Sequence, residues 1–199
     1  MLDVETTGIN PLETRMVEIA IVEIDRGGRM VDEYSTLLSV PGEGPVGAEF
    51  IHHISREMLA GAPTFAEVIG QITSHLVGRI IVGHVVAFDL GHMREEFRRA
   101  NLQLPVLVGA TLCTRDLARV ALPPGPKTLQ ACCSALGIEI KAAHTALGDA
   151  RATADLLIRL LRSSDDVESL GKHAASIPWP EIPVESTAPK IRDDRDRSD

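Results

Sequence analysis

The sequence predicts an α/β fold in which a central mixed sheet of about five strands is flanked by helices on both faces. Strand-like segments come first along the chain, and segments with helical periodicity follow them. A short, nearly all-apolar run, Arg79 to Gly83, lies between two of the predicted helices. Such a run is typical of a strand that helices cover on both faces. With 199 residues, 44% of them hydrophobic, the chain suits one globular domain plus an extension.

The first part of the chain predicts an antiparallel meander of three strands. The first strand begins at Met1 and ends at the turn at Gly8, and two more are expected at Met16 to Ile24 and Met30 to Val40. Residues 25–29, Asp-Arg-Gly-Gly-Arg, lie between the last two and form a hairpin signal. We therefore expect these two strands to pair directly.

Helical patterns follow the meander. Thr64 and Glu67 form a capping box, and apolar residues then recur at helical spacing to about Val77. Further helices are predicted at Phe88 to Ala100, Arg115 to Leu122, Thr128 to Leu136 and Leu147 to Arg162. The folded domain is therefore expected to cover residues 1–162.

Residues 163–199 have the composition of a disordered tail, rich in proline, serine and mixed charges. They include the only tryptophan, Trp179, between Pro178 and Pro180. This segment is either a solvated linker or a docking peptide for a polymerase or repair protein, because a proline-stiffened aromatic loses little entropy on binding. Both interpretations remain open.

The net charge of −8 is unusual for a nucleic-acid-binding protein, which usually has a basic surface. The tail carries nine acidic and five basic side chains, so half of the net charge lies outside the predicted domain. Two bound divalent ions would offset the other half.

Other features restrict the class of protein. The three cysteines, Cys113, Cys132 and Cys133, have neither disulfide nor zinc-ligand spacing and are expected to be reduced thiols of a cytoplasmic protein. No apolar run is long enough to span a bilayer, so no membrane association is expected. One Trp, one Tyr and four Phe are too few for a platform that stacks long single strands.

Five residues in three segments are candidates for an active site: Asp3, Glu5, Asp89, His144 and Asp149. Asp3 and Glu5 are two apart in a strand and must point to the same face, where they repel each other unless a cation binds. Asp89 lies just after the buried strand, and Asp149 lies in the first turn of the last helix. Open α/β sheets tend to place their sites near such strand ends.

Carboxylates in this pattern indicate metal-assisted phosphodiester hydrolysis, in which two divalent cations activate water and stabilise the leaving oxygen. The ordinary pKa of a histidine, about 6.5, suits His144 to act as a general base near neutral pH. Each residue also has a simpler interpretation. Asp89 could be a helix N-cap, Asp149 could complement a helix dipole, and His144 could be a loop residue. The joint occurrence of all of them favours a site.

Three segments resemble the exonuclease motifs of the DEDDh family, and most closely those of DnaQ-like proteins related to the epsilon proofreading subunit of bacterial DNA polymerase III. They are Asp3-Val4-Glu5-Thr6-Thr7-Gly8, Val82-Gly83-His84-Val85-Val86-Ala87-Phe88-Asp89 and His144-Thr145-Ala146-Leu147-Gly148-Asp149-Ala150. The resemblance covers residues 1–162 and implies a ribonuclease-H-like fold. It also implies 3′-to-5′ release of nucleoside monophosphates with two divalent ions, Mg²⁺ or Mn²⁺.

The resemblance also implies roles for individual residues. The metal ligands would be Asp3, Glu5, Asp89 and Asp149. His144 would be the general base, and Thr6, with its backbone amide, would help to seat the terminal nucleotide. Residues 51–59 resemble the segment of the family that flanks the substrate, which makes His52 a candidate for a nucleic-acid contact.

The chain departs from the family pattern in two places. Family members usually have Asn where this chain has Val85, and a valine side chain cannot supply the hydrogen bonds of an amide. Only Met1 and Leu2 precede Asp3, whereas the first strand of the family normally has several apolar residues there, so we expect the chain to begin inside its central strand.

The leading hypothesis is therefore a 3′-to-5′ deoxyribonuclease of DNA proofreading or repair, acting on a single-stranded or frayed 3′ end. An exoribonuclease remains open, because the same motifs serve both sugars and a 2′-hydroxyl is discriminated by other contacts. A non-catalytic module that recruits a polymerase through the tail is the third hypothesis. The five intact site residues disfavour it.

Overall fold

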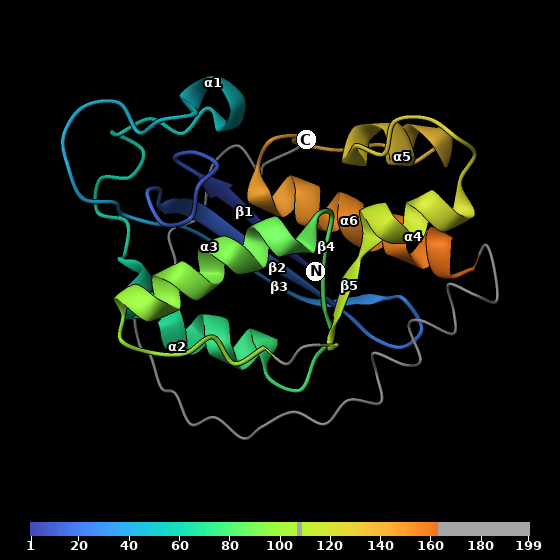
Figure 1. Cartoon of the computed structure of the whole chain (residues 1–199), viewed down its shortest axis with the longest axis horizontal. Helices are drawn as coiled ribbons and strands as arrows, with labels where there is room; N and C mark the ends of the chain where they lie inside the picture. Colours follow the sequence, from blue (N-terminus) through green and yellow to red (C-terminus); the bar gives the residue numbers. More distant parts are fainter. Residues whose placement is uncertain (107–108, 163–199) are drawn as a thin grey trace.

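The computed structural model describes residues 1–106 and 109–162. Its first three strands are β1 (Leu2–Thr6), β2 (Met16–Ile24) and β3 (Met30–Leu37). They form an antiparallel sheet in the order β1-β2-β3, which confirms the predicted meander and its hairpin (Figure 1). The expectations for residues 163–199, including those for Trp179, lie outside the described residues.

Two short parallel strands complete the mixed sheet. The predicted buried strand is β4 (Ile81–Gly83), and it pairs with β5 (Thr111–Cys113). β4 also contacts β1, so β1 lies between β2 and β4. The expected five strands are therefore present, although their hydrogen bonds divide them into a three-stranded and a two-stranded ladder. β5 was not predicted, because three residues are too short to show a periodic pattern.

The predicted helices all occur, with ends within two residues of those expected, as is usual for helix boundaries. They are α2 (Phe65–Leu76), α3 (Val86–Arg99), α4 (Thr114–Ala121), α5 (Leu129–Ala135) and α6 (Ala146–Leu161). The capping box of Thr64 and Glu67 is formed at the start of α2. One additional helix, α1 (Glu49–His52), is a single turn without a hydrophobic repeat that the sequence could reveal.

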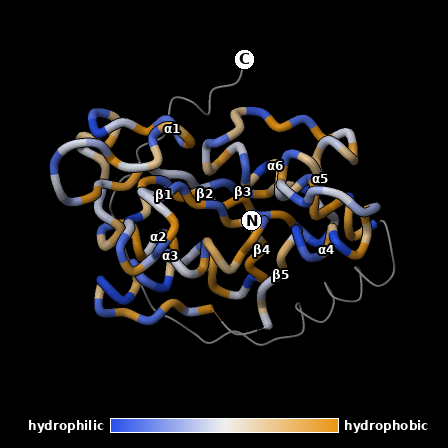
Figure 2. Tube along the Cα trace, turned by 45° about the horizontal axis from the view of Figure 1, so that its top comes forward, coloured by the Kyte–Doolittle hydropathy of each residue, from blue (hydrophilic) through white to orange (hydrophobic). Residues whose placement is uncertain are grey.

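The helices cover the two faces of the three-stranded sheet with separate apolar clusters (Figure 1). Leu2 and Val4 of β1 pack with α2 and α3, whereas Ala20 and Val22 of β2 pack with α4, α5 and α6. Figure 2 shows hydrophobic residues along β4 and around the N-terminus, in the middle of the molecule. Since side chains alternate along a strand, residues 3 and 5 of β1 face away from Leu2 and Val4 and towards α6.

Cys113, Cys132 and Cys133 are free thiols, as expected, and the last two are buried. Burial raises the pKa of Cys133 to about 12, so its thiol is inert at neutral pH. Within residues 1–106 and 109–162, no helix is long and apolar enough to cross a membrane.

Candidate active site

Three carboxylates meet between β1 and the start of α6. One oxygen atom from each of Asp3, Glu5 and Asp149 lies within 4.8 Å of the other two, and we call these residues the carboxylate cluster. Asp3 and Glu5 share a face of β1, whereas Asp149 extends from the first turn of α6. The pairing of β1 with β2 is irregular directly after Glu5, between Glu5 and Thr6. Bulges of this kind often redirect side chains beside active sites.

Asp89 reaches the same region from α3. It is the fourth residue of that helix, and Val85 occupies the N-cap position, so the alternative interpretation of Asp89 as an N-cap is wrong. Its side chain is 4% exposed, and its carboxylate accepts a hydrogen bond from the backbone amide of Val4. A Cβ atom at Gly83 would lie 3.0 Å from Oδ2 of Asp89. Glycine at the end of β4 therefore leaves room for this carboxylate.

The electrostatics of these carboxylates disfavour a site without cations. Burial raises the pKa of Asp3 well above its usual value, and the negative charge of Asp89 raises it further. Burial raises the pKa of Asp89 to about 7. Burial also raises the pKa of Asp149, which the neighbouring His144 partly opposes. Four converging carboxylates in a partly desolvated site fit hard divalent cations such as Mg²⁺ or Mn²⁺, which prefer oxygen ligands.

His144 is exposed on the loop that leads into α6, where its charge acts on Asp149. Its backbone amide also donates a hydrogen bond to the carboxylate of Asp149. The loop is tightly built: Thr145 caps the helix by accepting from the Gly148 amide at 3.0 Å and donates to the carbonyl of Ala142 at 2.8 Å. The structure therefore brings His144 and Asp149 together, as the sequence predicted.

The loop that follows β1 is held by α3. Thr6 is buried, and its hydroxyl donates to the carbonyl of Gly8 at 2.8 Å. Arg15 binds the carboxylate of Glu96 at 2.7 Å, and Arg99 donates to carbonyls of the same loop. Thr6 is therefore held next to the carboxylate cluster, and its hydroxyl is hydrogen-bonded within its own loop.

The expectation that His52 contacts nucleic acid is wrong for its side chain. His52 is only 1% exposed. Its Nε2 lies 2.9 Å from the carbonyl of Gly47, and its Nδ1 accepts the amide of Ile54 at 3.0 Å. The buried imidazole thus cross-links two backbone groups of its own loop, whereas the neighbouring His53 is exposed.

Glu18 is a residue of this site that the sequence analysis passed over. It lies in β2 directly opposite Glu5, is 0% exposed, and accepts the amide of Ala146 at 3.1 Å through Oε2. The available signal was a glutamate among the apolar residues 16–22 of β2, where burial of a charge is costly.

His84 also lacked an assigned role, although it lies in the second motif. Its Nδ1 is 2.9 Å from Oγ1 of Thr114, and its Nε2 is 2.9 Å from the carbonyl of Lys127. Burial lowers the pKa of this histidine, which favours a neutral ring. The imidazole thereby ties the turn after β4 to the loop before α5.

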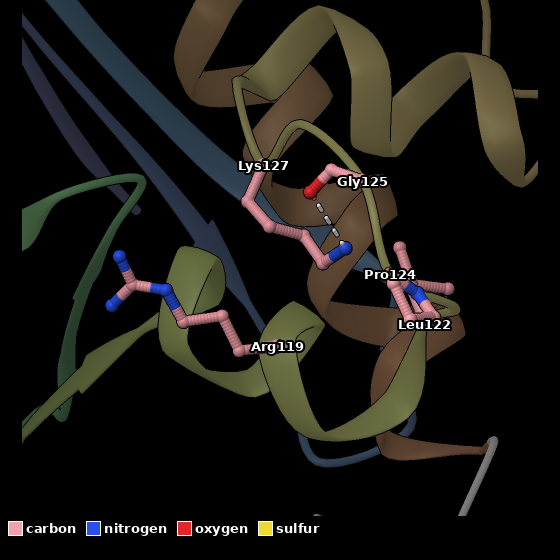
Figure 3. Close-up of a pocket in the computed structure, with 5 residues that line it drawn as sticks. All are labelled: Arg119, Leu122, Pro124, Gly125 and Lys127. Atoms are coloured by element: carbon pink, nitrogen blue, oxygen red, sulfur yellow. Dashed lines mark hydrogen bonds between the residues drawn. The ribbon is translucent and has the colours of Figure 1, made fainter.

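A pocket lies between the end of α4 and the loop before α5 (Figure 3). It is lined by Arg119, Leu122, Pro124, Gly125 and Lys127. The Lys127 ammonium donates to the carbonyls of Pro123 at 2.7 Å and Gly125 at 3.2 Å, so it is held by its own loop. None of the candidate carboxylates lines this pocket, which is therefore distinct from the carboxylate cluster.

The α/β fold and the converging carboxylates define a nuclease. Residues 1–157 match the RNase_T family, described as exonuclease. The chain belongs to this exonuclease family, whose members depend on metal ions, and it is therefore an enzyme. This confirms the resemblance on which the sequence analysis relied.

Similar proteins include subunits and polymerases of the DNA polymerase III type. The DNA polymerase III subunit epsilon of Aquifex aeolicus (strain VF5) is 29% identical over 165 residues, which are 81% of this chain and 79% of that protein. A DNA polymerase III subunit epsilon-like protein of Rhodobacter capsulatus is 36% identical over 81% of this chain but only 23% of its own length. A PolC-type DNA polymerase III of Bacillus cereus is 30% identical over 81% of this chain and 11% of its own length.

Solved structures show the same fold. Exonuclease X, in complex with 5′ overhanging duplex DNA, is 26% identical with a TM-score of 0.62, and the match covers 87% of this chain and 97% of that one. Exonuclease I is 20% identical with a TM-score of 0.74, over 86% of this chain and 42% of that one.

Proposed function

We propose that this exonuclease removes nucleoside 5′-monophosphates from the 3′ ends of DNA with two divalent ions, Mg²⁺ or Mn²⁺, in proofreading or repair. The observation that carries the proposal is the convergence of Asp3, Glu5 and Asp149 within 4.8 Å, with Asp89 acting electrostatically on Asp3. Converging carboxylates in a partly desolvated site repel one another, and cations remove that repulsion.

The four carboxylates would hold the ions. When bound, such ions activate an attacking water and stabilise charge on the leaving oxygen. His144 would accept the proton of that water, since its backbone amide binds the carboxylate of Asp149 on a loop fixed by Thr145. Thr6 would seat the terminal nucleotide through its backbone amide, next to the irregularity in β1.

DNA is the proposed substrate because of the relatives. The Aquifex protein is named as a subunit of a DNA polymerase, and the exonuclease X structure contains DNA with a 5′ overhang, which leaves a recessed 3′ end. We therefore favour a single-stranded or frayed DNA 3′ end over RNA. Association with a polymerase or repair protein through residues 163–199 remains a prediction.

The test compares DNA and RNA oligonucleotides of one sequence, each labelled at the 5′ end. We expect a ladder of labelled DNA products that shortens from the 3′ end, release of nucleoside 5′-monophosphates, and complete inhibition by EDTA. A matched Asp149→Asn preparation controls for contaminating nucleases. RNA degradation faster than DNA degradation would replace the proposal with an exoribonuclease, and shortening from the 5′ end would overturn the stated direction.

A further inference from the structure

A fifth carboxylate lies behind the carboxylate cluster, in the interior of the sheet. Glu18 of β2 is the register partner of Glu5 in β1. Residues paired directly across an antiparallel ladder point to the same face, so Glu18 and Glu5 both face α6. Glu18 is 0% exposed, whereas Glu5 is only half-buried.

Glu18 is bonded to the helix that carries Asp149. Its Oε2 accepts the backbone amide of Ala146 at 3.1 Å. Ala146 is the first residue of α6, and amides in the first turn have no partner within the helix. A carboxylate at this end also interacts favourably with the helix dipole. The bond fixes the start of α6 against β2, three residues before Asp149.

Stability alone does not account for a glutamate at this position. The other residues of β2 on this face, Ala20 and Val22, are apolar and pack with α6. Replacing a buried charge by a well-packed apolar side chain is often neutral or stabilising. Moreover, the negative charge of Glu18 raises the pKa of Asp3 and so adds to the repulsion in the cluster.

We propose that Glu18 is a positioning residue of the nuclease site, which anchors the first turn of α6 so that Asp149 faces Asp3 and Glu5, and whose negative charge increases the affinity of the cluster for divalent cations. The inference rests on the proposed function in one respect, namely that the cluster holds the ions. Glu18 itself acts through its neighbours, since its bond is to the backbone of α6.

Two substitutions separate the two effects. Glu18→Gln keeps the shape and an oxygen that can accept the Ala146 amide but removes the charge, whereas Glu18→Leu removes both. Glu23→Gln is the matched control, because Glu23 is also a largely buried glutamate of β2 but lies in a different group of charges. Binding of Mn²⁺ to the full chain is measured by calorimetry without nucleic acid, together with thermal melts in EDTA.

We expect Glu18→Gln to weaken Mn²⁺ binding by about 10-fold or more, the usual cost of losing a group that supports metal ligands. Its metal-free melting temperature should equal or exceed that of the wild type, and saturating Mn²⁺ should restore most of its activity. Glu18→Leu should bind Mn²⁺ at least as weakly, and Glu23→Gln should bind it like the wild type.

Mn²⁺ binding by Glu18→Gln within twofold of the wild type would overturn the inference, whether or not its melting temperature falls. Equal weakening in Glu23→Gln would do the same, because the effect would then be general. Asp149→Asn tests the proposed function separately. If that variant binds Mn²⁺ like the wild type, the cluster is not the metal site and the proposed function fails, whatever Glu18 does.

Discussion

Two groups of side chains in the described part of the chain bring potential metal ligands equally close together but differ in how their charges are compensated. Each brings three potential metal-binding atoms within 4.8 Å of one another. One is the carboxylate cluster of Asp3, Glu5 and Asp149, and the other, which we call the His75 cluster, comprises Glu23, Asp32 and His75. β2 and its neighbours thus carry two candidate sites of similar geometry.

A neighbouring cation, Arg79, compensates one carboxylate of the His75 cluster. Nδ1 of His75 lies 2.8 Å from Oε1 of Glu23 and 3.9 Å from Oδ2 of Asp32. Arg79 binds the other oxygen of Glu23 at 2.7 Å. In the carboxylate cluster, by contrast, burial raises the pKa of Asp3, and the negative charges of Asp89 and Asp149 raise it further. The two clusters therefore differ in charge compensation rather than in the proximity of their atoms.

The largest expected effect is the loss of catalysis when a carboxylate is removed. Asp89→Ala should lower the exonuclease rate by at least about 100-fold, because one oxygen ligand is lost where cations stabilise the reacting oxygens. Glu23→Gln, the matched change in the His75 cluster, should leave the rate within about twofold once the protein is folded. Single-turnover assays on a 5′-labelled oligonucleotide measure both, and equal losses would erase the distinction between the clusters.

Removing a histidine should lower turnover beside the carboxylate cluster but not in the His75 cluster. His144→Ala should lower turnover roughly 100-fold by removing the general base, with Mn²⁺ binding retained. Its activity should partly recover as the pH rises, because hydroxide becomes available without a base. His75→Ala should keep both its turnover and the pH dependence of the wild type. Wild-type turnover of His144→Ala at pH 7 would exclude His144 from the mechanism.

Asp89 should make a contribution to the stability of the metal-free protein that is lost as the pH rises. The pKa of Asp89 is about 7 in the folded state, against about 3.9 for an unfolded aspartate. The folded state therefore binds more protons between these values, and the free energy of unfolding falls as the pH rises through this window. In EDTA we expect the melting temperature of the wild type, measured relative to that of Asp89→Asn, to be higher at pH 5 than at pH 7.5.

Metal should reverse that loss. Mn²⁺ should raise the melting temperature of the wild type at pH 7.5 in proportion to the logarithm of its concentration, as for a ligand of the native state. Asp149→Asn should abolish activity yet stabilise the metal-free protein by about 1 kcal/mol, if about one pKa unit of repulsion is relieved. Should it melt well below the metal-free wild type, with an unchanged Mn²⁺ shift, Asp149 would be a structural residue of α6.

The sequence predicted the meander and the long helices because each has a local signal. It also singled out five residues that the fold brings into one region, and their catalytic roles remain predictions. The alternation of side chains along a strand indicates that Asp3 and Glu5 share a face of β1. The predicted start of α6 places Asp149 in the first turn of that helix. The predictions from the sequence failed where only tertiary contacts decide the outcome. His52 was expected to contact nucleic acid, but its own loop folds around it. The role of Glu18 depends on the packing of β2 beside Ala146, which no local sequence pattern shows.

The two regions also differ in backbone conformation. Beside the carboxylates, Val85 has a φ of 82° and His144 a φ of 64°, although neither is glycine. Next to the His75 cluster, the residues with positive φ are Gly28 at 81° and Gly78 at 75°, which adopt this conformation without strain. Strained backbone is typical of functional sites, and a β-branched residue in the left-handed region is an outlier.

Val85→Asn should therefore stabilise the protein, by about 1 kcal/mol or less, because asparagine tolerates the left-handed region that costs most residues about 1–2 kcal/mol. The substitution also restores the amide usual in this family, so the KM for DNA should fall or stay constant. Gly78→Ala is the control, and we expect it to lower rather than raise stability. No atom would crowd a Cβ at Gly78, so the positive φ alone should destabilise the variant by about 1 kcal/mol. Urea unfolding in EDTA measures both variants. If Val85→Asn unfolds at lower urea than the wild type, packing of the valine outweighs its backbone strain, and the site is not strained at this turn.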